Sequence, residues 1–239
     1  RAGWGVIQID NFTPCSGRKF DDLIASAQKL AGITEEVVEL GDVAHGILPV
    51  PPMKEDPRSV SIEEKSELLA AIEEAARHPA VVNRRANYIE RIEQVRFTDS
   101  SDNEFRYEVC RSGFNVLAVA SRNANVQMGY EREHTIHGFA LRHRQEIGRK
   151  AAEIAVALLD AGAVKGGRMH AVLDPELAGV FAHEAVGHAS EGDLIHEGNS
   201  VLKGKTGEKI GDEILTIVDD PALREFGFDP VDAEGTAVK

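Results

Sequence analysis

The chain has 239 residues and a formal net charge of −13, and its hydrophobic and charged fractions are ordinary for a folded globular protein. The acidic balance and the lack of a basic cluster argue against a nucleic-acid interface. The longest apolar run, residues 154–159, is too short for a membrane span, and the first residues lack the shape of a signal peptide. We therefore expect a protein that binds neither nucleic acid nor membrane.

Cysteine usage points to a reducing compartment. Cys15 and Cys110 are the two cysteines of the chain, and they form no C-x-x-C pair. No disulfide framework is therefore indicated, although a single bridge between the two stays open. A cytoplasmic location is the simplest setting.

Both ends of the chain have the composition of interior sequence. Residues 1–9 predict a strand already under way, and the last residues follow a predicted strand and turn, so we expect a piece of a longer protein or its ordered part. Apolar residues at helical spacing predict an amphipathic helix over about residues 20–31, ended by Gly32.

The next segments alternate between connector and helix. The proline-rich residues 37–57 cannot form a helix and predict an extended connector. Ser61 and Glu64 form a capping-box pattern, in which each side chain bonds the other residue's backbone N–H, and the helix it opens is expected to end near His78.

Alternating polar and apolar residues then predict strands. Phe105, Tyr107 and Val109 alternate with charged residues, which is typical of a half-buried strand. We expect an antiparallel meander, a polar loop at residues 131–138 and a long helix over about residues 141–161. The four expected strands lie near residues 88–97, 104–111, 115–121 and 125–131.

The predicted fold class is therefore α+β, with an antiparallel meander packed with two or three long helices. A glycine-rich stretch predicts a domain boundary near residue 165. Residues 1–165 would form an N-terminal α+β domain, and residues 166–239 the beginning of an incomplete second domain. Short strands are expected at residues 169–173 and 214–218 of that second part.

The most informative segment is residues 174–193. Asp174 can cap a helix, Pro175 suits its first turn, and apolar residues at helical spacing, such as Leu177 and Val180, follow. The segment continues as H-E-A-V-G-H, which is one residue longer than the H-E-x-x-H motif of zinc proteases, where the glutamate is the general base.

The extra residue makes a regular helix unsuitable for metal binding. Residues five apart on an α-helix point about 140° away from each other, so His183 and His188 could not then hold one ion. Either the motif is accidental and these are ordinary histidines, or the helix breaks before His188, or one π-type turn realigns the rings. Gly187 would lower the steric cost of such a turn. If the motif is functional, we therefore expect an irregular helix.

This motif, followed by Glu191-Gly192-Asp193, resembles the TldD/PmbA family of metallopeptidases, on the TldD side, where the H-E-x-x-x-H signature is present. The resemblance covers nearly the whole chain. It implies that residues 166–239 begin a C-terminal metallopeptidase domain, and that the family sequence continues beyond both ends of the chain. Further family-like segments are residues 125–131, 207–210, 215–221 and 232–236.

The resemblance implies a metal-dependent peptidase, with zinc as the expected cofactor, that acts on short or unfolded peptides. His183 and His188 would be metal ligands, and Glu184 the general base that takes a proton from the attacking water. Glu191 and Asp193 are candidate supporting residues. The resemblance also implies a homodimer, or a heterodimer with a TldE/PmbA-type subunit that lacks the metal motif.

The third metal ligand is expected outside this chain. In the family it is a cysteine far towards the C-terminus, and no residue here occupies that position. Four nearby side chains could substitute, but the sequence selects none of them. We therefore expect this chain alone to bind zinc weakly or not at all and to lack peptidase activity. The four candidate substitutes are Glu191, Asp193, His196 and Glu197.

Two other functional classes stay open. The chain could belong to a non-catalytic subunit or binding module in which the His–Glu set is vestigial. It could also belong to another metal-dependent hydrolase, such as an amidase, because bond choice depends on pocket shape. Outside the motif, His134 and His137 are weak candidates for a second metal site, and Cys110 is a weak ligand candidate.

Overall fold

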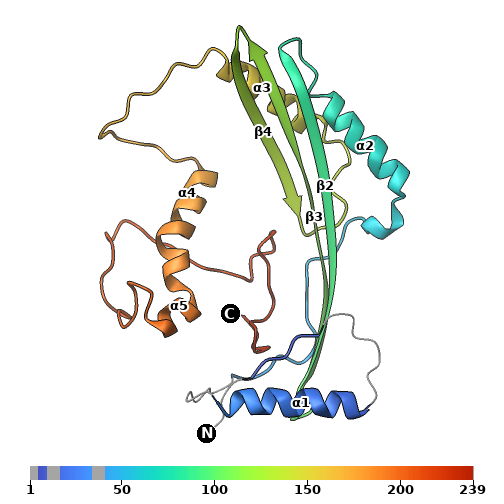
Figure 1. Cartoon of the computed structure of the whole chain (residues 1–239), viewed down its shortest axis with the longest axis vertical. Helices are drawn as coiled ribbons and strands as arrows, with labels where there is room; N and C mark the ends of the chain where they lie inside the picture. Colours follow the sequence, from blue (N-terminus) through green and yellow to red (C-terminus); the bar gives the residue numbers. More distant parts are fainter. Residues whose placement is uncertain (1–4, 10–16, 34–40, 239) are drawn as a thin grey trace. The chain divides into compact units, whose positions relative to one another are not determined.

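The computed structural model describes residues 5–9, 17–33 and 41–238, apart from the side chains of residues 17 and 18. The chain divides into two compact units, and the smaller one comprises the described parts of Arg1–Gly46, Phe97–Phe105 and Val231–Ala237. Figure 1 shows the elements, which are α1 (Gly17–Ala31), β1 (Gly46–Ile47), a 3-10 turn (Pro57–Ser59), α2 (Ile62–Glu74), β2 (Val81–Thr98), β3 (Glu104–Arg122), β4 (Asn125–Thr135), α3 (Gln145–Leu158), α4 (Pro175–Ala182), a π-helical turn (His183–Gly187), a 3-10 turn (His188–Ser190) and α5 (Gly192–Glu197).

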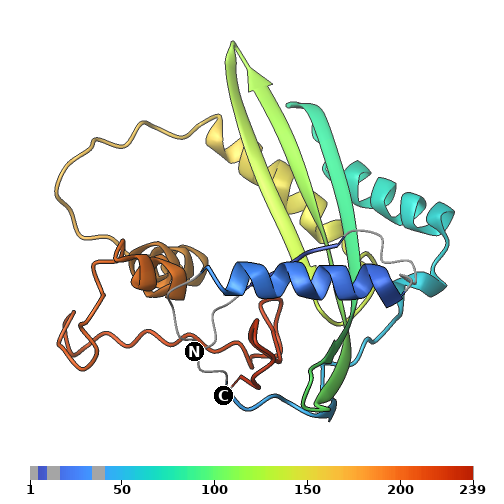
Figure 2. The ribbon, with the colours of Figure 1, turned by 60° about the horizontal axis from the view of Figure 1, so that its bottom comes forward.

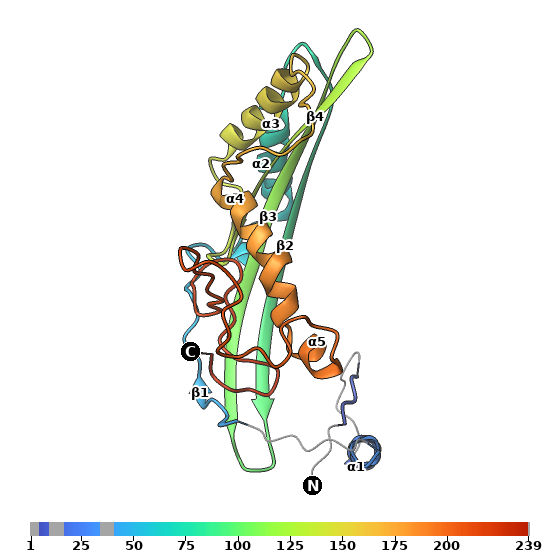
Figure 3. The ribbon, with the colours of Figure 1, turned by 90° about the vertical axis from the view of Figure 1, so that its left-hand side faces the viewer.

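The sheet has four strands, in which β3 pairs with β1, β2 and β4, and most of its residues belong to the larger unit. β3 and β4 are antiparallel, with a register from Ser112↔Thr135 to Arg122↔Asn125. Helices α2 and α3 pack on one face of this sheet (Figure 3). The expected α+β class, with helices packed on a sheet, is confirmed.

The core lies between that sheet face and the two helices. Alternate residues of β3, from Phe114 to Ala120, are fully buried, which is the period-2 pattern of a strand with one covered face. α3 runs along β4 (Figure 2). Two glycines permit close approach here: a Cβ on Gly129 would lie 2.0 Å from the Ala151 carbonyl oxygen, and one on Gly148 would lie 2.1 Å from that of Ile72.

Strand β3 corrects the predicted strand count. It runs unbroken through residues 111–115, where the sequence predicts a break between two strands. Gly113 lies inside this strand, and a Cβ there would lie 2.2 Å from Cδ2 of His134 on the paired strand. Its small size makes room for that imidazole. β4 continues to Thr135, so residues 131–135 of the loop predicted at residues 131–138 are also strand.

Helix α2 begins as predicted but forms only half of its capping box. Ser61 accepts a hydrogen bond from the Glu64 N–H at 3.1 Å. The Glu64 carboxylate instead accepts from Arg142 Nη1 at 2.8 Å, so it is engaged by a residue 78 positions away. α2 ends at Glu74, before the expected His78, and α3 begins at Gln145 instead of residue 141.

Two predicted strands, at residues 169–173 and 214–218, do not form, although their composition favours a strand. Residues 5–9, the described part of the strand predicted over residues 1–9, also belong to no strand. Val172 is 100% exposed and Ile214 is 93% exposed, so the apolar pattern of the first two segments has no covering partner among the described residues. Propensity alone does not hold a strand that lacks a neighbour.

The smaller unit contains α1, which matches the predicted amphipathic helix closely. Its segment 231–237 packs on aromatic rings: Phe97 and Phe105 stack with their centroids 4.9 Å apart. Gly235 has a φ of +86°, and a Cβ there would lie 2.9 Å from Phe105 Cε1, so glycine is required for both conformation and space.

Two further expectations concern the cysteines and the membrane. Cys110 is a buried free thiol, and burial raises its pKa. Because Cys110 is free, it forms no bridge with Cys15, which itself lies outside the described residues. None of the helices in the described ranges combines the length and apolarity that a bilayer crossing requires.

Candidate metal centre

Helix α4 begins as its sequence predicts. The Asp174 carboxylate accepts a hydrogen bond from the Leu177 N–H at 2.8 Å, and Pro175 stands in the first turn, where no donor is needed. The expected apolar face is present but uncovered: Leu177, Val180 and Phe181 are exposed by 47 to 61%. The start of the helix is therefore set by local capping, because tertiary burial contributes little.

The helix deforms where the motif requires it. Residues His183–Gly187 form a π-helical turn, in which the His188 N–H donates to the His183 carbonyl five residues earlier. The wider turn places the two imidazoles on one side of the helix. The predicted irregular helix is thus confirmed, and the regular α-helix that would separate the two rings is absent from this segment.

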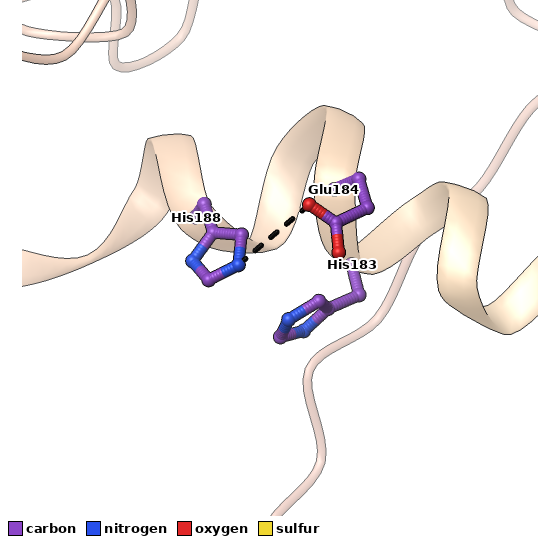
Figure 4. Close-up of side chains that lie close together, drawn as sticks. All are labelled: His183, Glu184 and His188. Carbon is purple, nitrogen blue, oxygen red and sulfur yellow. Dashed lines mark ion pairs between the residues drawn. The ribbon is translucent and has the colours of Figure 1, made fainter.

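The two rings and Glu184 form a compact group (Figure 4). The ring centroids of His183 and His188 are 4.3 Å apart, with their planes at 65°. Glu184 Oε2 lies 3.8 Å from His188 Nε2. One ligand atom from each of the three side chains lies within 4.8 Å of the others, and the described residues contain no second group of this kind.

The chemistry of this group fits zinc. Two imidazole nitrogens and a carboxylate are donors that zinc accepts in proteins. Ligand atoms about 2.0–2.1 Å from one ion are at most about 4 Å apart. All three side chains are exposed, so rotamer changes can close the remaining gap from 4.8 Å. The group could therefore hold a zinc ion through two or three of its side chains, with further ligands from elsewhere.

Gly187 has a different role from the expected one. Its φ of −53° and ψ of −59° are ordinary right-handed helical values, which any residue adopts. A Cβ there would lie 3.5 Å from His183 Nδ1, an ordinary van der Waals distance. The expectation that glycine relieves steric cost in the deformed turn is therefore not supported by this geometry.

The structure separates the candidate supporting residues. Glu191 reaches the site, with its Oε1 2.6 Å from His188 Nδ1. Asp193 does not: its carboxylate accepts from the Leu194 N–H at 2.8 Å. Glu197 accepts from Asn199 at 2.9 Å, and neither it nor His196 belongs to the three-residue group.

A cavity of about 610 Å³ opens beside the motif. It is lined on one side by His183 and Glu191, and on another by Ile217, Val218 and Asp219. The sequence suggests a turn role for Asp219, with substrate binding as the weaker alternative. Only the folded chain brings it beside His183, because 36 residues separate the two positions and no local periodicity links them.

The other candidate ligands do not assemble. The His134 ring lies against Phe226, with centroids 5.0 Å apart, and His137 Nδ1 lies 3.4 Å from the Pro52 carbonyl oxygen. In the described part of the chain, neither histidine joins a group of three metal-ligating side chains, and neither does Cys110.

Comparisons with known proteins identify the family to which the chain is similar. Residues 55–159 match the family model of the PmbA/TldA metallopeptidase central domain, and residues 166–239 that of the C-terminal domain. A metalloprotease of Archaeoglobus fulgidus is 40% identical over 77% of this chain and 43% of its own length. A zinc metalloprotease TldD homologue of Saccharolobus solfataricus is 28% identical over 68% of the chain and 38% of its own length.

Solved structures share the fold. A candidate modulator of DNA gyrase from Bacteroides thetaiotaomicron has a TM-score of 0.77 at 19% identity, covering 95% of this chain and 54% of that one. TldE from Thermococcus kodakarensis has a TM-score of 0.63 at 18% identity, covering 95% and 52%. The chain spans about half the length of the relatives it matches. The two matched domain models and the identity to metalloproteases together place the chain in the PmbA/TldD family of metallopeptidases.

Proposed function

We propose that this chain carries part of the active site of a zinc-dependent peptidase, with His183 and His188 as metal ligands and Glu184 as general base. The observation that supports this most strongly is the π-helical turn, which brings together two imidazoles whose spacing would otherwise separate them. A regular α-helix would serve folding equally well, so the π-helical turn favours a functional role for this segment.

The side chains divide the chemistry between them. When bound, zinc would polarise the scissile carbonyl and make a water molecule more acidic. The Glu184 carboxylate, one residue from His183 and 3.8 Å from His188 Nε2, can accept a proton from that attacking water and return it to the leaving amine. The adjacent cavity of about 610 Å³ would receive an extended peptide segment.

The domain organisation and the assembly belong to the same proposal. Residues 1–165 would form an N-terminal α+β domain, and residues 166–239 the beginning of the metallopeptidase domain, which the separate matches at 55–159 and 166–239 support. The third zinc ligand would lie outside this chain. We expect the chain alone to bind zinc weakly and to lack activity, so tight stoichiometric zinc in it would contradict this.

The full-length protein would act on short or unfolded peptides as a dimer, with itself or with a TldE/PmbA-type subunit. The fold shared with TldE supports the second arrangement. A non-catalytic subunit is the alternative, and the exposed, uncovered apolar face of α4 is compatible with an assembly role. Zinc content measured on the full-length protein, alone and with such a subunit, separates the two, because a vestigial site binds zinc in neither sample.

Replacement of the base tests the proposal directly. Glu184→Gln in the full-length protein removes the proton acceptor but keeps the side-chain shape, so peptide hydrolysis should fall by about 10²–10⁴-fold or more while zinc content stays unchanged. Peptide cleavage assays and zinc analysis on the same samples measure both effects.

Glu176→Gln is the matched control, because Glu176 lies in the first turn of the same helix and pairs with Arg132 outside the three-residue group. Retained hydrolysis in Glu184→Gln would remove Glu184 as the base. A parallel loss of zinc would instead make Glu184 a ligand.

A further inference from the structure

We propose that Glu191 is a positioning residue that fixes the tautomer and orientation of His188, so that His188 presents Nε2 to the metal. This inference rests on the proposed zinc site. Glu191 Oε1 lies 2.6 Å from His188 Nδ1, a short hydrogen bond between a carboxylate and an imidazole. On the other side of the ring, Nε2 faces the group and lies 3.8 Å from Glu184 Oε2.

The chemistry of the pair decides the tautomer. An ionised carboxylate only accepts hydrogen bonds, and a neutral imidazole carries one N–H. The bond to Glu191 therefore places the proton of His188 on Nδ1 and leaves the Nε2 lone pair free for a metal. A carboxylate behind a ligating imidazole also fixes the ring and strengthens the nitrogen as a donor.

The main chain holds Glu191 in this place. The Glu191 N–H donates to the His188 carbonyl at 3.3 Å, which closes the 3-10 turn His188–Ser190. The Ser190 hydroxyl donates to the Val186 carbonyl at 2.9 Å, and the Ser200 hydroxyl donates to the Ala189 carbonyl. The Glu191 side chain thus follows a turn whose backbone carbonyls accept hydrogen bonds from residues within the turn and after it.

The imidazole of His183 differs from that of His188 in its hydrogen bonding. The structure gives the His183 ring no hydrogen-bond partner among the described residues, and its neighbour is the ring of His188. Of the two candidate ligands, His188 alone has a carboxylate at hydrogen-bond distance from its ring among the described residues. Glu191 therefore acts on one ligand specifically and does not simply add negative charge to the site.

Nitrogen-15 NMR of the metal-free full-length protein at a pH where His188 is neutral tests the tautomer without requiring zinc or activity. We expect His188 to be protonated at Nδ1, this preference to be lost in Glu191→Ala, and the preference to persist in Glu191→Gln, whose amide oxygen also accepts a hydrogen bond. Glu213→Ala is the charge-matched control, because Glu213 pairs with Lys209 away from the motif.

Zinc affinity of the full-length protein, measured by competition with a chromophoric chelator, gives the second readout. Glu191→Ala should weaken zinc binding by about 10–100-fold, Glu191→Gln should restore most of it, and Glu213→Ala should leave it unchanged. Circular dichroism of each variant checks that the fold is kept.

The outcomes separate the two proposals. An Nε2-protonated His188 in the wild type, or a tautomer unchanged in Glu191→Ala, overturns the role of Glu191 whether or not zinc binds. Equal loss of affinity in Glu191→Ala and Glu213→Ala also overturns it, because the effect would then be one of net charge. Absence of zinc from the wild-type full-length protein contradicts the proposed function itself.

Discussion

The site depends at residue scale on the contact between two imidazoles and on the backbone bond that permits it. The His188 N–H bonds the His183 carbonyl, and the ring centroids come to 4.3 Å. Gly187 stands between them with ordinary helical dihedral angles. The deformation therefore does not depend on glycine's access to unusual conformations.

Substitution of Gly187 tests this point. Gly187→Ala should stabilise the turn by about 0.5–1 kcal/mol, because alanine has the higher helix propensity and its methyl group meets open or ordinary contacts. Exchange of the His188 amide hydrogen should then slow by about two- to fivefold. Faster exchange would show that the π-helical turn requires glycine.

Gly207→Ala is the contrasting control. Gly207 has a φ of +83° and no atom within 4 Å of an added Cβ, so its substitution strains the backbone without a steric clash. It should accelerate exchange around residue 207 and leave His188 unaffected.

Sequence reasoning succeeds where a single residue's neighbours are local. If His183 and His188 hold one ion, their five-residue spacing requires an irregular helix on helical geometry alone, and the cap by Asp174 is equally local. Gly113 and Glu64 could not be assigned in this way. One makes room for His134 and the other binds Arg142, and both partners are fixed only by tertiary contact.

At the scale of elements, the sheet and its two helices are organised around close approaches. Gly148 of α3 faces the Ile72 carbonyl of α2, and Gly129 of β4 faces the Ala151 carbonyl of α3. Small residues at these points allow the layers to approach closely, and the fully buried Ala151 and Ala155 continue the same contact. The packing of α3 is therefore intolerant of added volume.

Gly148→Ala measures that intolerance. A Cβ 2.1 Å from the Ile72 carbonyl oxygen must push the helices apart, so the free energy of unfolding should fall by about 1–3 kcal/mol despite the better helix propensity of alanine. Urea denaturation gives the change. Gly162→Ala, where the added Cβ meets nothing within 4 Å, should change stability by less than about 0.5 kcal/mol. Equal effects would contradict the close-approach account.

The sequence predicts the type of most helices and strands correctly, but their first and last residues less accurately. The helices and the strand regions between residues 61 and 161 were expected, because their apolar periodicity matches the face they bury. The sequence predicts two strands where β3 runs unbroken through residues 111–115. The strands expected at residues 169–173 and 214–218 lack partners, which no local pattern reveals.

Buried residues are distributed unevenly along the chain of the whole molecule. Between residues 160 and 227 no residue is buried. Strand β3, by contrast, contains several buried residues between Phe105 and Ala120. Large apolar side chains such as Val172 and Ile214 are almost fully exposed in this segment. The candidate metal centre therefore lies in a part of the chain that contributes little to the core.

Hydrogen exchange tests this unevenness. Amides of residues 160–227 should exchange at least about 10²-fold faster, relative to their intrinsic rates, than those of residues 114–120, because little buried apolar surface opposes local opening. Mass spectrometry of peptide fragments resolves the two regions in one sample. Equal protection would show that residues 160–227 unfold cooperatively with the sheet. In the full-length protein we expect their protection to increase.

The most direct test of whether His183 and His188 hold one zinc ion is X-ray absorption spectroscopy of the full-length protein at the zinc edge. We predict one zinc per chain with two imidazole nitrogens at about 2.0–2.1 Å, and the loss of one of them in each of His183→Ala and His188→Ala. Zinc whose coordination shell is the same in the wild type and in both variants would contradict the account.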